Sequence, residues 1–95
     1  GAAEKRLSSF HAKDVRQRLA GLLLMLEEHH GEESPLGTKL NIKLSRREMA
    51  STIGTAQETL IRFFSEFKKE GLIMEEDKSI YILDEEGLKE FAGTD

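Results

Sequence analysis

The chain has no cysteine and no apolar stretch long enough to cross a bilayer. Without cysteine, neither disulfides nor cysteine metal sites hold the fold together, which suits the reducing cytoplasm where we expect this protein. The longest apolar run, residues 22–26, is far shorter than the roughly 20 residues of a membrane helix. Phosphate-binding glycine loops, metal-ligand sets and nucleophile–base pairs are also missing, so the sequence predicts no enzyme, no cofactor and no metal site.

Basic residues are scarce for a nucleic-acid-binding protein, because 14 Lys and Arg stand against 18 Asp and Glu, for a net charge of −4. Their distribution is uneven. Residues 38–70 contain seven basic and four acidic side chains, and the remaining chain is strongly acidic. A basic patch on an acidic body is compatible with DNA binding, but it predicts weak non-specific affinity for this domain by itself.

The hydrophobic pattern begins with an amphipathic helix over about residues 9–30, whose apolar side chains recur at helical spacing. Residues 32–38 contain Pro35 and Gly37 and are expected to form a loop. Residues 40–44 alternate apolar and polar side chains, which predicts a short strand with one buried face. With 95 residues, the chain has room for one domain.

The most informative segment is 45–73, which predicts two helices, about 46–53 and 56–70, joined by a tight turn. Ser45 and Glu48 form one capping-box pattern, and Thr55 and Glu58 form a second. Gly54 stands between them, where the first helix must stop and the backbone must turn with positive φ. This spacing is typical of a helix-turn-helix that reads DNA.

The C-terminal third predicts a β-hairpin and a last short helix. Residues 72–74 and 80–83 read as two strands around a turn at 76–79, which places a wing behind the helix-turn-helix. Asp84 can cap the last helix, with Leu88 and Phe91 facing the core. We therefore predict an α+β fold, a winged helix-turn-helix that is mainly helical with a small antiparallel sheet.

From about residue 14 to 91 the chain resembles the C-terminal winged-helix domain of the Crp/Fnr transcription regulators. The stretches that carry the resemblance are 15–20, 44–50, 53–59 with Arg62, and 70–73. Such regulators usually have an N-terminal effector-sensing barrel and a long dimerisation helix, and neither is present here. The resemblance thus implies a DNA-binding domain at 9–93, preceded at 1–8 by a linker remnant or a cloning scar.

The resemblance also implies partners and a mechanism. We expect the intact protein to bind double-stranded DNA as a homodimer and this fragment to be monomeric. The resemblance leaves open whether RNA polymerase is a further partner of the intact protein. The second motif helix, about 56–70, would lie in the major groove. Its expected base contacts are Gln57, Glu58, Ile61 and Arg62. Glutamate can accept from cytosine, arginine can donate a fork to guanine, and glutamine suits adenine.

The expected phosphate contacts lie at helix N-termini, on the exposed flank of the second motif helix and at the wing tip, namely Ser45, Arg46, Thr55, Thr59 and Lys78. Several of these residues have a second interpretation. Glu58 is equally explained by the capping box, and Arg62 by an ion pair with Glu58 or Glu66. A winged helix used for protein–protein contact is the alternative function, and the acidic balance and the exposed Ile61 favour it.

Overall fold

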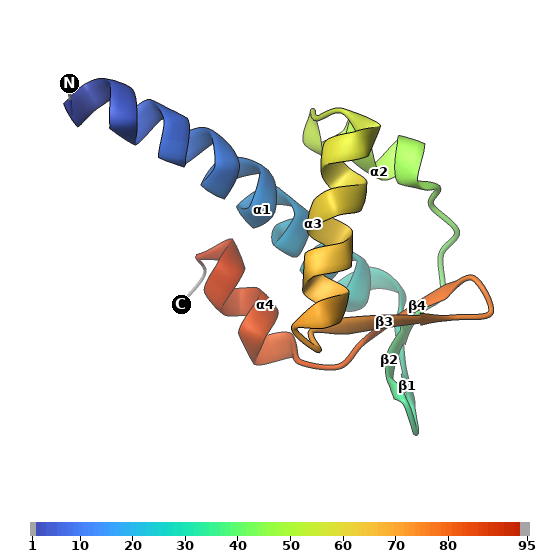
Figure 1. The fold of residues 1–95 in the computed structure, drawn as a ribbon. Helices are drawn as coiled ribbons and strands as arrows, with labels where there is room; N and C mark the ends of the chain where they lie inside the picture. Colours follow the sequence, from blue (N-terminus) through green and yellow to red (C-terminus); the bar gives the residue numbers. More distant parts are fainter. Residues whose placement is uncertain (1, 94–95) are drawn as a thin grey trace.

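The structure is a computed structural model that describes the backbone of residues 2–93 and the side chains of residues 15–93. Its elements follow the order α1 (Ala2–His30), β1 (Gly31–Ser34), β2 (Gly37–Leu40), α2 (Arg46–Ile53), α3 (Gln57–Lys69), β3 (Ile73–Glu76), β4 (Ser79–Ile82) and α4 (Glu85–Ala92) (Figure 1). The four strands form one antiparallel sheet in the order β1-β2-β4-β3. The α+β winged helix-turn-helix that the sequence predicts is confirmed.

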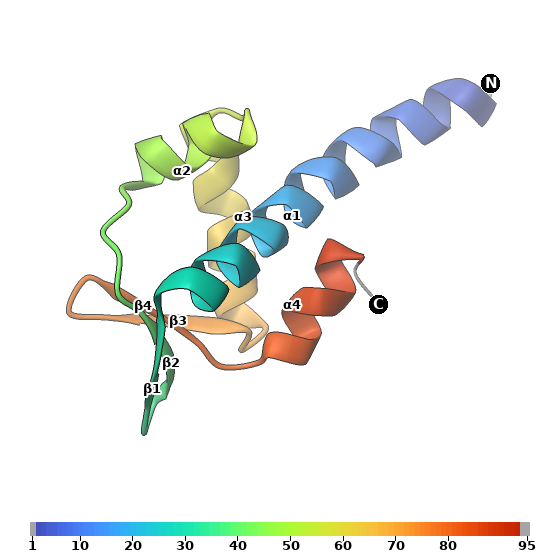
Figure 2. The ribbon, with the colours of Figure 1, turned by 180° about the vertical axis from the view of Figure 1, so that it is seen from behind.

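Helix α1 is the centre of the core. Figure 2 shows α4 along one side of its C-terminal half and α2 on the other. The buried apolar side chains come from every helix and from strands β2, β3 and β4, and the largest fully buried ones are Leu19, Leu23, Met49, Leu60, Phe64, Phe67, Ile73 and Leu88. Within residues 2–93, no helix combines the length and apolar character that crossing a membrane requires.

Residues 31–40 form a hairpin, so the expected loop at 32–38 is wrong. Strands β1 and β2 pair from Gly31 with Leu40 to Ser34 with Gly37. The Ser34 hydroxyl donates to the Gly37 carbonyl at 2.6 Å and closes the turn. Gly37 has φ 135°, and a Cβ there would lie 2.7 Å from the Ile82 carbonyl oxygen, so only glycine fits against β4.

The expected strand at 40–44 is also wrong, because strand β2 ends at Leu40 and the following residues are irregular. The alternation that suggested a strand has another cause. Leu40 is buried, and Ile42 and Leu44 pack partly buried against the core. Ile42 and Leu44 therefore reach the core from a segment that joins no sheet, directly after the strand that ends at Leu40.

The helix-turn-helix forms as expected. Ser45 accepts from the Glu48 amide and Glu48 accepts from the Ser45 amide, both at 3.0 Å, so the first capping box is confirmed. Gly54 ends α2 with φ 73°. The Thr55 amide then donates to the Ala50 carbonyl at 2.9 Å, which closes the turn before α3 begins.

The wing is strands β3 and β4, which pair from Ile73 with Ile82 to Glu76 with Ser79. Its two turn residues, Asp77 and Lys78, both have positive φ, as a type I′ hairpin turn requires. The predicted wing is thus confirmed, with strand ends that differ from the prediction by one or two residues. The last helix also forms as expected, since the Asp84 carboxylate accepts from the Gly87 amide at 3.0 Å.

Candidate nucleic-acid interface

Helix α3 has one buried and one exposed face. Leu60, Phe63, Phe64 and Phe67 are buried, so the aromatic side chains belong to the core rather than to a base-stacking surface. The opposite face carries all four residues that the sequence predicts as base contacts, Gln57, Glu58, Ile61 and Arg62, and all of them are exposed. The helical spacing therefore brings these four side chains together on one solvent-facing surface.

The second capping box does not form. The N-cap of α3 is Ala56, which has no side-chain acceptor, and not Thr55. The Thr55 amide that Glu58 would have to accept from is already donated to the Ala50 carbonyl. Glu58 lies in the first turn of α3, where its negative charge interacts favourably with the helix dipole. Among the described residues its carboxylate has no hydrogen-bond or ion-pair partner, so it is free to accept from a base.

The second interpretation of Arg62, an ion pair on its own helix, is not what the structure shows. Glu66 pairs instead with Arg16, whose Nη2 lies 3.0 Å from its Oε1. The Arg62 guanidinium lies 5.4 Å from the centre of the Phe63 ring. Within residues 15–93 it has no ion-pair partner, and its donors remain available on the exposed face.

Two arginines of α1 hold the motif helices in place, and the sequence analysis missed both. Arg16 lies between the rings of Phe63 and Phe91, with distances of 5.0 and 5.9 Å to their centres, and ties α1 to α3 and α4. Arg18 donates from Nη1 to the Ile53 carbonyl at 2.8 Å, at the C-terminal end of α2. These contacts join residues 35 to 75 positions apart, so no local pattern could have predicted them.

The predicted phosphate contacts lie on a rim beside α3. Ser45 is exposed at the N-terminus of α2, but its hydroxyl serves the capping box. Thr55 and Thr59 are partly buried next to the start of α3. Lys78 is exposed at the tip of the wing. These residues belong to the N-terminal ends of α2 and α3 and to the tip of the wing, positions of the kind that can contact a DNA backbone.

Arg46 differs from the other predicted phosphate contacts because its guanidinium is already paired with another side chain of the protein. Its Nη2 lies 2.6 Å from Oε2 of Glu75 on strand β3, and its guanidinium lies 4.2 Å from the centre of the Phe64 ring. Lys68 binds the other oxygen of Glu75 at 3.4 Å. The hydrogen bond from Arg46 is the largest cause that lowers the pKa of the Glu75 carboxyl, and the charges of Arg46 and Lys68 lower it further.

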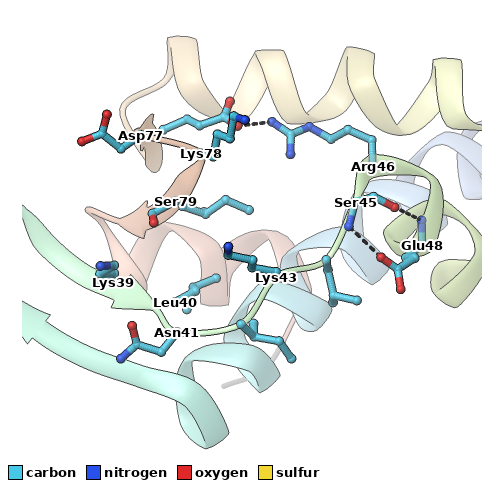
Figure 3. Close-up of a pocket in the computed structure, with 14 residues that line it drawn as sticks. Lys39, Leu40, Asn41, Lys43, Ser45, Arg46, Glu48, Asp77, Lys78 and Ser79 are labelled. Carbon is cyan, nitrogen blue, oxygen red and sulfur yellow. Dashed lines mark hydrogen bonds and ion pairs between the residues drawn. The ribbon is translucent and has the colours of Figure 1, made fainter.

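A groove of about 740 Å³ opens between β2, residues 41–45 and the wing (Figure 3). Four basic side chains line it, Lys39, Lys43, Arg46 and Lys78, against three acidic ones, Glu48, Glu75 and Asp77. The positive charge of residues 38–70 is thus partly gathered beside the N-terminus of α2. The basic side chains exceed the acidic ones by only one, a small positive excess that favours an anion such as a phosphate group.

Comparison with known proteins agrees with this geometry. Residues 17–91 match the family model of the Crp-like helix-turn-helix domain. The chain is 32% identical over 91 residues to the transcriptional regulatory protein btr of Bordetella pertussis, covering 96% of this chain and 38% of that protein. It is 32% identical over 93 residues to the transcriptional regulator SdrP of Thermus thermophilus, covering 95% of this chain and 44% of SdrP.

Among solved structures, the chain is similar to the CO-dependent transcription factor CooA from Carboxydothermus hydrogenoformans in its imidazole-bound form. The two superpose with a TM-score of 0.81 and 30% identity, over 95% of this chain and 42% of CooA. The chain therefore spans about two fifths of the length of the relatives it matches.

The chain belongs to the Crp-like helix-turn-helix family, as a DNA-binding domain of the Crp/Fnr transcription regulators. It is a module of transcription regulation and not an enzyme. The resemblance that the sequence carries is confirmed, and a winged helix devoted to protein–protein contact is not favoured.

Proposed function

We propose that this domain reads a specific DNA sequence by placing the exposed face of α3 in the major groove. One observation carries the proposal. Glu58 and Arg62, one helical turn apart, both project from α3 without ion-pair partners among the described residues. A surface acid and base at this spacing can pair with each other, whereas here both keep their hydrogen-bonding capacity for a ligand.

The four exposed side chains suggest the bases that each would contact. Arg62 can donate two hydrogen bonds to guanine O6 and N7, and Glu58 can accept from the N4 amino group of cytosine. Gln57 suits adenine N6 and N7. Ile61, which is 42% exposed, offers an apolar surface to a thymine methyl group.

The backbone of the DNA would be held from both sides of α3. Ser45, Arg46, Thr55 and Thr59 are proposed for the phosphates at the helix N-termini, and Lys78 for a phosphate reached by the wing. These contacts orient α3 in the groove and carry no base information, so they set affinity and its salt dependence.

The proposal extends to the protein that contains this domain. We infer a homodimer that binds two half-sites about one helical turn apart and acts in the cytoplasm, where RNA polymerase is its further partner. An effector bound elsewhere in that protein would shift the population of arrangements in which both α3 helices fit the DNA. The domain alone is proposed to be a monomer.

The test begins with duplexes selected by the wild-type domain from a random pool, followed by binding measurements on two variants of Arg62. Arg62→Ala should cost about 1–3 kcal/mol of specific binding. Arg62→Lys keeps the charge and loses the planar fork, so it should lose most of the same specificity with little change in the salt dependence.

A parallel NMR titration at low salt maps the bound surface. Amide shifts on α3 and the wing tip that fade as salt is added are the expected result. The reading proposed here is wrong if Arg62→Ala binds the selected duplex as tightly as the wild type, or if the shifts lie away from α3. Shifts away from α3 would redirect the search to a protein partner.

A further inference from the structure

The side chain of Arg46 points along α3 toward the wing, although Arg46 stands at the N-terminus of α2 where a phosphate would bind. Figure 3 shows this extended side chain with its bond to the wing carboxylate. The bond joins Nη2 to Oε2 of Glu75 at 2.6 Å, and the guanidinium lies 4.2 Å from the centre of the Phe64 ring. Its side chain is only 27% exposed. In this arrangement Arg46 is committed to the protein.

The carboxylate that holds Arg46 has a second cation at hand. Lys68 Nζ lies 3.4 Å from Oε1 of Glu75, and 5.5 Å from the centre of the same Phe64 ring. Each oxygen of Glu75 therefore has its own cationic partner. If Arg46 left, the carboxylate would still be paired, which removes most of the cost of leaving a partly buried charge alone.

We propose that Glu75 takes the place of a DNA phosphate on Arg46 in the free domain, and that DNA binding transfers Arg46 to a phosphate while Lys68 retains Glu75. The inference rests on the proposed DNA-reading function. Carboxylate and phosphate oxygens accept the same charge-assisted bonds from a guanidinium, so the two compete for one fork. The N-terminus of α2 favours an anion at the place where Arg46 would turn.

The exchange predicts opposite effects on DNA binding for Glu75 and Lys68, neither of which needs to contact the DNA. Glu75 holds Arg46 back, so its charge weakens DNA binding by more than a neighbouring acid does. Lys68 lowers the free energy needed to release Arg46, because it stays paired with Glu75. It therefore strengthens DNA binding without touching the DNA. A fixed clamp, in which Glu75 merely orients Arg46 toward DNA, would give the opposite sign at Glu75.

The first experiment compares Glu75→Gln with Glu76→Gln by fluorescence anisotropy on a duplex selected by the wild-type domain. Both variants remove one negative charge from strand β3, and Glu76 is exposed with no side-chain partner among the described residues. Glu75→Gln should tighten binding about three- to tenfold, and Glu76→Gln by no more than about twofold. Glutamine keeps the size of the side chain, and thermal unfolding verifies that both variants are folded.

The second experiment removes the charge of Lys68, the second cation paired with Glu75. Lys68→Met should weaken binding about fivefold more than Lys69→Met, which removes the same charge from the exposed end of α3. In the Glu75→Gln background this difference should vanish, because no carboxylate remains to be retained. The cycle thus isolates the interaction between Lys68 and Glu75 from any general loss of positive charge.

Three results would overturn the exchange. Binding that weakens in Glu75→Gln, or changes no more than in Glu76→Gln, would show that Glu75 does not compete for Arg46. A Lys68→Met effect that persists in Glu75→Gln would assign Lys68 to direct DNA contact. The Arg46 side-chain NMR signal supplies an independent check, since it should shift when the wild type binds DNA, and an unmoved signal rejects the exchange. Failure of the wild type to select any duplex would instead overturn the proposed function.

Discussion

Replacing Gly54 by alanine should destabilise the domain by about 1 kcal/mol. Gly54 has φ 73° and ψ 41°, a left-handed conformation that costs an alanine about 1–2 kcal/mol. Alanine also reduces the conformational entropy of the unfolded chain, which offsets about 0.4–1 kcal/mol of that loss. The added Cβ would lie 3.5 Å from Arg18 Nη1, an ordinary contact, so crowding adds nothing further. For a domain of this size, the expected fall in melting temperature is about 4–8 °C.

The matched control is Gly21→Ala. Gly21 and Gly54 both line a groove between α1 and α2, and a Cβ at Gly21 would meet nothing within 4 Å. Because Gly21 lies inside helix α1, alanine should stabilise the domain by about 0.5–1 kcal/mol. Gly54→Asn should fall between Gly54→Ala and the wild type, because asparagine tolerates the left-handed region better than alanine.

Urea unfolding followed by circular dichroism gives all three free energies under one set of conditions. The two alanine variants should move the midpoint in opposite directions. A Gly54→Ala domain as stable as the wild type would show that the turn is not held in the left-handed conformation. A destabilised Gly21→Ala domain would show that the groove between α1 and α2 is filled in solution.

Two further predictions concern the far side of the domain. Burial, followed by a hydrogen bond and the like charge of Glu85, raises the pKa of the Glu27 carboxyl above 4.5. Ionised Glu27 therefore lowers the free energy of unfolding as pH rises above that value. In urea unfolding, Glu27→Gln should stabilise the domain at pH 7 and lose this advantage below about pH 4.5. An equal gain at both pH values would contradict the prediction. Leu88 is fully buried, so Leu88→Ala should lower the free energy of unfolding by about 2–5 kcal/mol in the same assay, and a loss under 1 kcal/mol would mean that α4 is not part of the core.

The elements that the sequence predicts well are those with a local cause. The capping box of Ser45 and Glu48 is set by residues three apart, and the positive φ of Gly54 by one residue. The wing needs only two apolar segments around a two-residue turn. Interactions of this range can be read along the chain, which is why the helix-turn-helix, the wing and the exposed face of α3 follow from the sequence.

The hairpin at 31–40 shows what local patterns miss. Strand β1, Gly-Glu-Glu-Ser, is exposed over its first three residues and lies at the edge of the sheet, so no burial requirement gives it an alternating pattern. It exists because its backbone pairs with β2, which in turn pairs with β4 more than 40 residues away. The bond between Arg46 and Glu75, 29 residues apart, escapes sequence reasoning for the same reason.

The two capping-box patterns show how one local signal can give two outcomes. Ser45 and Thr55 are each followed three residues later by glutamate, and each precedes a helix. Ser45 follows an irregular segment, so its amide is free for Glu48. The Thr55 amide donates to the Ala50 carbonyl at the end of α2, so Glu58 cannot accept from it. The N-cap of α3 is therefore Ala56, one position after Thr55. The tightness of the turn, and not the helix signal itself, thus leaves the Glu58 carboxylate exposed one helical turn before Arg62, on the face of α3 that we propose contacts the bases.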